Sequence, residues 1–154
     1  MLNNLNIRPR NKSQRILFSA ITGLVCAIVL GFAYGGIMHY MNIPVELQAV
    51  FMFIGMGIGL AIQKIGRGVQ GQLEISIIAA ISAFICFLLA DMVTMFGFNI
   101  FTTNINMLPT VLRFTLRIWF DFSVGNTFSM ALSLLFRGAG IYFAYRNAVL
   151  MVNR

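Results

Sequence analysis

The sequence predicts an all-α membrane protein with four transmembrane helices and one interfacial amphipathic helix between helices three and four. Of its 154 residues, 59% are hydrophobic and only 10% are charged, whereas soluble domains average about 45–50% and about 25%. The mean hydropathy is +0.86, which excludes a soluble globular domain and a disordered chain. Four apolar runs follow one another along the chain, each near the roughly 20 residues that a helix needs to cross a bilayer.

The chain divides into a basic cytoplasmic tail, residues 1–15, and a single transmembrane domain, residues 16–154. The predicted crossings are residues 16–38, 47–63, 75–98 and 127–145. Pro44 ends the first run, because proline cannot continue a helix. Lys64 and Arg146 close the second and the fourth. The first run is longer than the apolar core of about 7–15 residues in a signal peptide, so we expect an uncleaved crossing.

Residues 108–123, between the third and fourth crossings, predict an amphipathic helix. Arg113, Arg117 and Asp121 recur every four residues and therefore share one helix face. Such a stripe is too polar to cross the bilayer easily. It suits a helix that lies in the membrane interface, with Trp119 at the level of the headgroups. A spanning helix that keeps its arginines inside a bundle is the alternative.

The distribution of basic residues predicts the orientation. The N-terminal tail carries four Lys and Arg residues and the second loop carries Lys64 and Arg67, whereas the first loop, HYMNIPVE, has none. Basic loops stay in the cytoplasm, so both termini are expected there. The net charge of +7 then indicates topology and contact with anionic headgroups, through Lys64 and Arg67 in particular, and no nucleic-acid partner. The GRGVQG sequence of this loop is interpreted as a turn, because no strand precedes it.

Two charges fall within predicted crossings: Asp91 in the third and Arg137 in the fourth. A charged side chain at the bilayer centre costs about 2.5–3.5 kcal/mol on insertion scales, so each is expected to have a partner. Counted from the outer ends of their helices, the two lie close enough in depth for a long arginine side chain to reach the carboxylate. We therefore predict an intramembrane ion pair. It serves either to pack helices three and four together or as a substrate or proton site.

Pairs of glycines at a spacing of four predict close helix contacts, because small residues let two backbones approach. Gly31 and Gly35 lie in the first crossing, and Gly55 and Gly59 in the second. Tight packing between helices one and two is the expectation, and self-association of the chain is the alternative.

The single histidine, His39, is expected at the outer face with Arg113, Arg117 and Asp121. A proton relay of His39 with Asp91 and Asp121 is the functional hypothesis, and an interfacial histidine is the simpler one. Neither a metal site nor a cofactor is predicted, because too few ligands cluster. The two cysteines fall in apolar runs and are expected to be buried thiols.

Two stretches, GMGIGLAIQKIGRGVQGQLEISIIAAISAFICFLLADMV and LLFRGAGIYFAYRNA, resemble uncharacterised small four-helix bacterial inner-membrane proteins over about a third of the chain. The resemblance implies a location in the bacterial cytoplasmic membrane and a four-helix layout, and no activity. The small size and scarce polar residues favour an accessory or structural subunit of a membrane complex, with a membrane-protein partner or a second copy bound in the lipid bilayer. A small oligomeric transporter or channel that uses Asp91 and Arg137 is the first alternative, and a lipid-modifying membrane enzyme is the second.

Overall fold

In the computed structural model, residues 11–41, 48–66, 73–102, 105–120 and 127–148 are described, and every element within these ranges is helical. This confirms the all-α prediction for that part of the chain. The elements, in order, are α1 (Lys12–Met41), α2 (Val50–Gly66), α3 (Leu73–Phe96), α4 (Asn99–Thr102), the 3₁₀ helix η1 (Ile105–Met107), α5 (Leu108–Phe120) and α6 (Thr127–Asn147).

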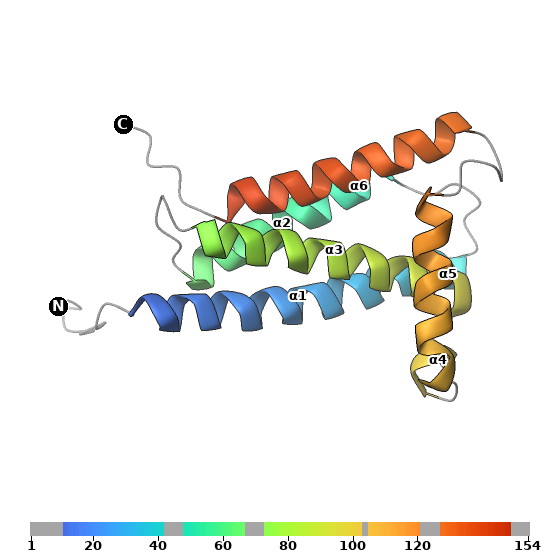
Figure 1. The fold of residues 1–154 in the computed structure, drawn as a ribbon, viewed down its shortest axis with the longest axis horizontal. Helices are drawn as coiled ribbons and strands as arrows, with labels where there is room; N and C mark the ends of the chain where they lie inside the picture. The colour runs from blue at the N-terminus through green and yellow to red at the C-terminus, as the bar shows by residue number, and fades with distance from the viewer. Residues whose placement is uncertain (1–10, 42–47, 67–72, 103–104, 121–126, 149–154) are drawn as a thin grey trace.

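The long axes of four helices, α1, α2, α3 and α6, are roughly aligned, and α5 crosses them at one end (Figure 1). The helices α1 and α3 run in the same direction. Lys12 binds Glu74 at the start of both, at 2.6 Å, and His39 meets the backbone of Thr94 near their ends. Consecutive aligned helices run in opposite directions, so the chain passes back and forth along this axis (Figure 1). We call the end where α5 lies the α5 end, and the other the Lys12 end.

Among the described residues, two helices, α1 and α3, are long and apolar enough to cross a membrane by length and composition. The sequence predicts four such helices. The difference has a physical basis in the other two. The helix α2 has only 17 residues, which is about 26 Å of helix. The helix α6 has 21 residues, but Arg137 and Arg146 lie within it.

The helix bounds differ from the predicted crossings mainly at their ends. The first crossing was expected at residues 16–38, whereas α1 runs from Lys12 to Met41. Polar residues at both ends continue the helix, because its backbone hydrogen bonds do not require apolar side chains. The amphipathic helix expected at residues 108–123 is α5, Leu108–Phe120; residues 121–123 lie outside the described ranges.

The short helices α4 and η1 were not predicted, since the stretch that forms them has no apolar period. The chain leaves α3 at Gly97, whose φ of +71° is a left-handed conformation that glycine adopts without strain. Beyond it, the ring of Phe32 on α1 contacts Phe98 and Phe101, with centroids 5.8 and 5.0 Å apart. These aromatic contacts hold α4 against the α5 end of α1.

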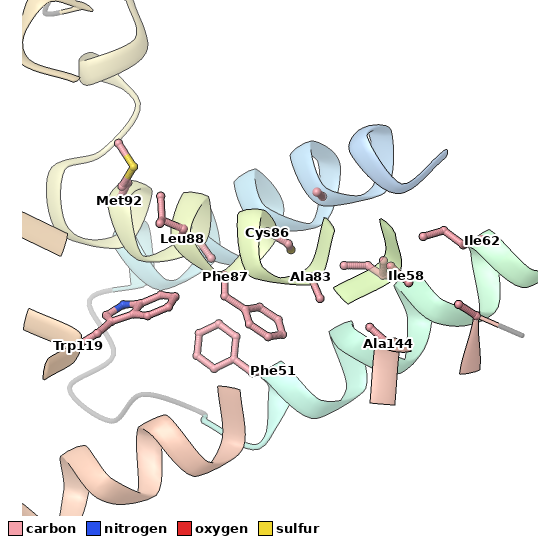
Figure 2. Close-up of a cluster of buried hydrophobic side chains, with 14 of the residues drawn as sticks. Phe51, Ile58, Ile62, Ala83, Cys86, Phe87, Leu88, Met92, Trp119 and Ala144 are labelled. Atoms are coloured by element: carbon pink, nitrogen blue, oxygen red, sulfur yellow. The ribbon is translucent and has the colours of Figure 1, made fainter. Parts of the chain in front are cut away.

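The interior of the bundle is a band of apolar side chains between α3, α2 and α6. Phe51 of α2 meets Phe87 of α3 in an edge contact with centroids 4.9 Å apart, and the indole of Trp119 lies beside them (Figure 2). Several small or polar side chains are also buried at helix contacts, whereas many large apolar side chains are on the outside. Val29 of α1 is 59% exposed and Phe53 of α2 is 70% exposed.

The paired glycines lie at close helix contacts, but their partners are not those predicted. In α1, a Cβ atom on Gly31 would lie 2.9 Å from the carbonyl oxygen of Cys86, and one on Gly35 would lie 2.6 Å from that of Ala90. Both acceptors belong to α3. The expected packing of helix one on helix two through these glycines is therefore wrong: they fit α1 against α3.

The glycines of α2 face α6 in the same way. A Cβ atom on Gly55 would collide with the carbonyl of Gly140, and one on Gly59 would lie 2.7 Å from the carbonyl oxygen of Ala144. The matched order of the two contacts shows that α2 and α6 run in the same direction. Since these positions are occupied by helices of the same chain, the prediction of self-association through them is not supported.

Candidate functional site

A buried ion pair joins α3 and α6 near the α5 end of the bundle. Nη2 of Arg137 donates to Oδ2 of Asp91 at 2.9 Å, and the two side chains are only 8% and 6% exposed. The structure thus brings together the two charges that the sequence places within predicted crossings. Taking two charges out of water is costly, and their attraction compensates for this only when further hydrogen bonds complete the geometry.

Trp119 of α5 supplies one such bond. Its indole Nε1–H donates to the same carboxylate oxygen, Asp91 Oδ2, at 2.7 Å. Trp119 was expected among the headgroups, whereas its side chain is buried in the bundle and is not exposed to the surroundings. The reason is that Val111, Thr115 and Trp119 recur every four residues and form the face of α5 that is buried. This pattern was visible in the sequence opposite the arginine stripe.

Two aromatic rings flank the guanidinium group. Cζ of Arg137 lies 5.1 Å from the centroid of Phe51 and 5.0 Å from that of Trp119. A cation over the face of an aromatic ring is attracted by the ring quadrupole, most strongly where water is excluded. Nη1 of Arg137 also donates to the hydroxyl of Ser133, one turn earlier in α6.

These contacts form a charge network, which we define as Phe51, Asp91, Trp119, Ser133 and Arg137. Its members come from α2, α3, α5 and α6, so the network ties four helices together at one depth. Sequence reasoning found the two charges but missed the other three members. For Trp119, the spacing of the apolar face of α5 was an available signal. Phe51 and Ser133 had no signal beyond their place in the apolar runs.

The chemistry of the network favours a fixed structure over reaction. One carboxylate oxygen accepts from two donors, and the guanidinium cannot lose its proton at physiological pH. A general acid or base has to exchange its proton with a substrate in hydrogen-bond reach. Here Asp91 is already engaged by Arg137 and Trp119, which are both donors.

The polar residues that were expected together at the outer face lie on different elements where the structure describes them. Nδ1 of His39 lies 3.0 Å from the carbonyl oxygen of Thr94, at the end of α3. Arg113 and Arg117 are exposed on α5. Asp121 lies outside the described residues. The relay hypothesis placed Asp91 with His39 and Asp121; the structure shows Asp91 bound by Arg137 and Trp119, and a contact with Asp121 falls outside the described residues.

At the Lys12 end, Lys64 is exposed in the last turn of α2, and Arg67 lies outside the described residues. Cys86 is buried, Cys26 is partly buried, and both are free thiols. Within the described ranges, no group of three His, Cys, Asp or Glu side chains is arranged to hold a metal ion.

Comparisons of this chain with protein-family models, with curated proteins and with solved structures gave no match.

Proposed function

We propose that this chain is a four-helix membrane protein that acts as an accessory or structural subunit of a membrane complex. In this proposal α1, α2, α3 and α6 cross the bilayer, α5 lies in the interface, and the medium around the bundle is lipid. The observation that carries the proposal is the distribution of side chains: the ion pair of Asp91 and Arg137 is buried inside the bundle, and many large apolar side chains are exposed on its outside.

The apolar exterior extends over all four aligned helices. Val29 of α1, Phe53 of α2 and Leu135 of α6 are 59%, 70% and 62% exposed, respectively. Soluble monomers rarely expose contiguous apolar patches beyond a few hundred Å². In lipid these side chains carry no such penalty, and helices associate through small residues and interhelical hydrogen bonds. The glycine contacts of α1 with α3 and of α2 with α6 are of this kind.

The helices α2 and α6, which are not long and apolar enough to cross a membrane by length and composition, also fit this arrangement. The polar residue that lowers the hydropathy of α6, Arg137, is neutralised inside the bundle by Asp91. A helix as short as α2 is accommodated by local thinning of the bilayer at modest cost. The helix α5, at 13 residues, is only about 20 Å long, and it runs across the bundle (Figure 1).

The charges favour a cytoplasmic location for the Lys12 end. Lys12, Lys64 and Arg146 lie in the first turn of α1 and the last turns of α2 and α6, which meet at this end (Figure 1). The positive-inside rule places such an end in the cytoplasm, with both termini on that side. Together with the resemblance noted above, this supports the bacterial cytoplasmic membrane as the location.

The charge network favours the structural role over transport. A transport site has to release its ion or solute, whereas here the carboxylate is bound by two donors and the guanidinium lies between two rings. Breaking such a network would loosen four helices at once. The conclusion is a stable membrane scaffold, whose partner is another membrane protein or a further copy of the chain.

Purification in mild detergent tests this proposal. We expect a stoichiometric membrane-protein partner, or a homo-oligomer, to co-purify with the chain. The Asp91→Asn variant should lower the melting temperature and reduce the recovered complex. The Lys64→Gln variant, which removes an exposed charge, is the matched control and should change neither.

Flux measurements on the same proteins distinguish a transporter or channel from a structural subunit. Wild-type protein in vesicles should show no movement of H⁺, Na⁺, K⁺ or Cl⁻ above protein-free vesicles. A flux in wild-type vesicles that disappears in a folded Asp91→Asn variant would support the transporter and overturn the structural subunit.

A further inference from the structure

We propose that the exposed face of α5 is a binding surface for anionic phospholipid headgroups, with Arg113 at its centre and Arg117 beside it. This inference rests on the proposed membrane location, and it adds a lipid class and a site. It concerns the side of α5 that the charge network does not use.

The placement of α5 gives all its residues nearly the same depth, because the helix runs across the end of the bundle (Figure 1). Its buried face, which includes Val111 and Trp119, is docked on the bundle. The opposite face is therefore held in a fixed orientation. Arg113 and Arg117 are exposed one turn apart on it, so that two guanidinium groups are presented to the same layer of the surroundings.

The charge of this face suits phosphate. The thirteen residues of α5, LPTVLRFTLRIWF, include two arginines and no acidic residue; Asp121, which follows them in the chain, lies outside the described residues. The planar guanidinium forms paired hydrogen bonds with phosphate oxygens, and it is more weakly hydrated than an ammonium group. A surface with anionic lipid attracts each nearby basic side chain by about 1 kcal/mol, which is about a five-fold gain in affinity per arginine.

Exposed phenylalanines on the same helix favour a lipid surface over an acidic protein as the occupant. Phe114 and Phe120 are both exposed, and Phe114 is positioned by an edge contact with Phe96 of α3, with centroids 5.9 Å apart. Arginines flanked by apolar aromatic groups are typical of helices that lie at the headgroup and acyl boundary. Tyr40, exposed at the end of α1, adds an aromatic group of the kind enriched at this level.

The single tryptophan of the chain is Trp119, on α5, so its fluorescence reports on this helix alone. The full-length protein is reconstituted into vesicles of phosphatidylcholine and phosphatidylglycerol, in which one lipid or the other is brominated near the headgroup end of its acyl chains. Bromine quenches nearby tryptophan. We expect brominated phosphatidylglycerol to quench Trp119 more than its mole fraction predicts.

Two variants localise the effect. Arg113→Gln with Arg117→Gln should abolish the excess quenching, with a loss of up to about 30-fold in the relative affinity for phosphatidylglycerol. The matched control, Lys64→Gln with Arg146→Gln, removes two exposed charges from the Lys12 end and should leave the excess quenching unchanged.

Three other outcomes would overturn the proposal. Equal quenching by the two brominated lipids in the wild type would show that α5 has no preference for anionic lipid, while leaving the membrane location intact. Excess quenching that persists in the α5 double variant would place the anionic lipid elsewhere. Absence of quenching by either lipid would refute the placement of α5 at the headgroup and acyl boundary, and failure of the protein to float with vesicles would refute the membrane location itself.

Discussion

Removing one charge of the Asp91–Arg137 pair is a change that affects four helices at once, because the charge network joins them. We consider the single variants Asp91→Asn and Arg137→Gln and the double variant that carries both. Each single change leaves one full charge in a place where the native side chain is less than a tenth exposed. The double variant leaves no charge, and the amide groups that replace the pair can still form hydrogen bonds.

The magnitude follows from the geometry. At 2.9 Å and an effective dielectric constant of about 20, the Coulomb attraction between the two charges is about 6 kcal/mol, before the cost of taking them out of water is subtracted. Measured losses on removing one partner of a buried pair are about 3–5 kcal/mol. The double variant should lose less than the sum of the two single losses, because it avoids the uncompensated charge. We expect a coupling free energy of about 2 kcal/mol or more.

Thermal unfolding in detergent, followed by helical circular dichroism, measures all four proteins of this cycle. Both single variants should melt well below the wild type, and the double variant should melt above at least one of them. Strictly additive losses, or single variants as stable as the wild type, would refute the claim that the charge network holds the four helices together.

Two further predictions concern helix contacts. Trp119→Phe keeps a ring near Arg137 but removes the hydrogen bond to Asp91, and a bond to a charged group is worth about 1.5–3 kcal/mol. The hydrogen-exchange rate of the α5 amides should therefore rise about ten-fold or more. Unchanged exchange would show that this bond does not hold α5 on the bundle. Gly55→Ala should destabilise the protein by about 1–3 kcal/mol, because the added Cβ atom collides with the carbonyl of Gly140. Gly57→Ala, two residues away, is the matched control, because nothing lies within 4 Å of the added Cβ atom. It should stabilise the helix by up to about 1 kcal/mol. Equal effects of the two changes on the melting temperature would contradict the close approach of α2 and α6.

The sequence predicted the helical class and the approximate course of each long helix, because apolar runs and polar interruptions are properties of the chain alone. It also indicated that Asp91 and Arg137 need partners, since few charges occur within the apolar runs. The site was predictable to that extent. The contribution of Trp119 was not recognised, because its amphipathic character suits an interface equally well until the buried face of α5 is identified.

The partners of the glycines illustrate a different limit. A spacing of four small residues indicates that a backbone approaches closely, but it does not say which backbone. Helices one and two were paired because they are adjacent in the chain, whereas Gly31 meets α3 and Gly55 meets α6. Small residues at the same spacing in the fourth crossing, Gly140 and Ala144, were a usable signal for the second of these contacts. The short helix α4 had no comparable signal, since four residues are too few to show a period.

Accessibility of cysteines introduced on α2 and α6 tests the central claim most directly, because these two helices do not meet the length and composition criteria for crossing. In a background with Cys26→Ala and Cys86→Ala, Leu60→Cys and Leu135→Cys place thiols at sites that are 51% and 62% exposed. In nanodiscs, both should be inert to a water-soluble maleimide and should react after denaturation, whereas the Tyr40→Cys control, at a site 77% exposed near the end of α1, should react at once. Labelling of the α2 and α6 sites in intact nanodiscs as fast as the Tyr40→Cys control would show that water, not lipid, surrounds these helices.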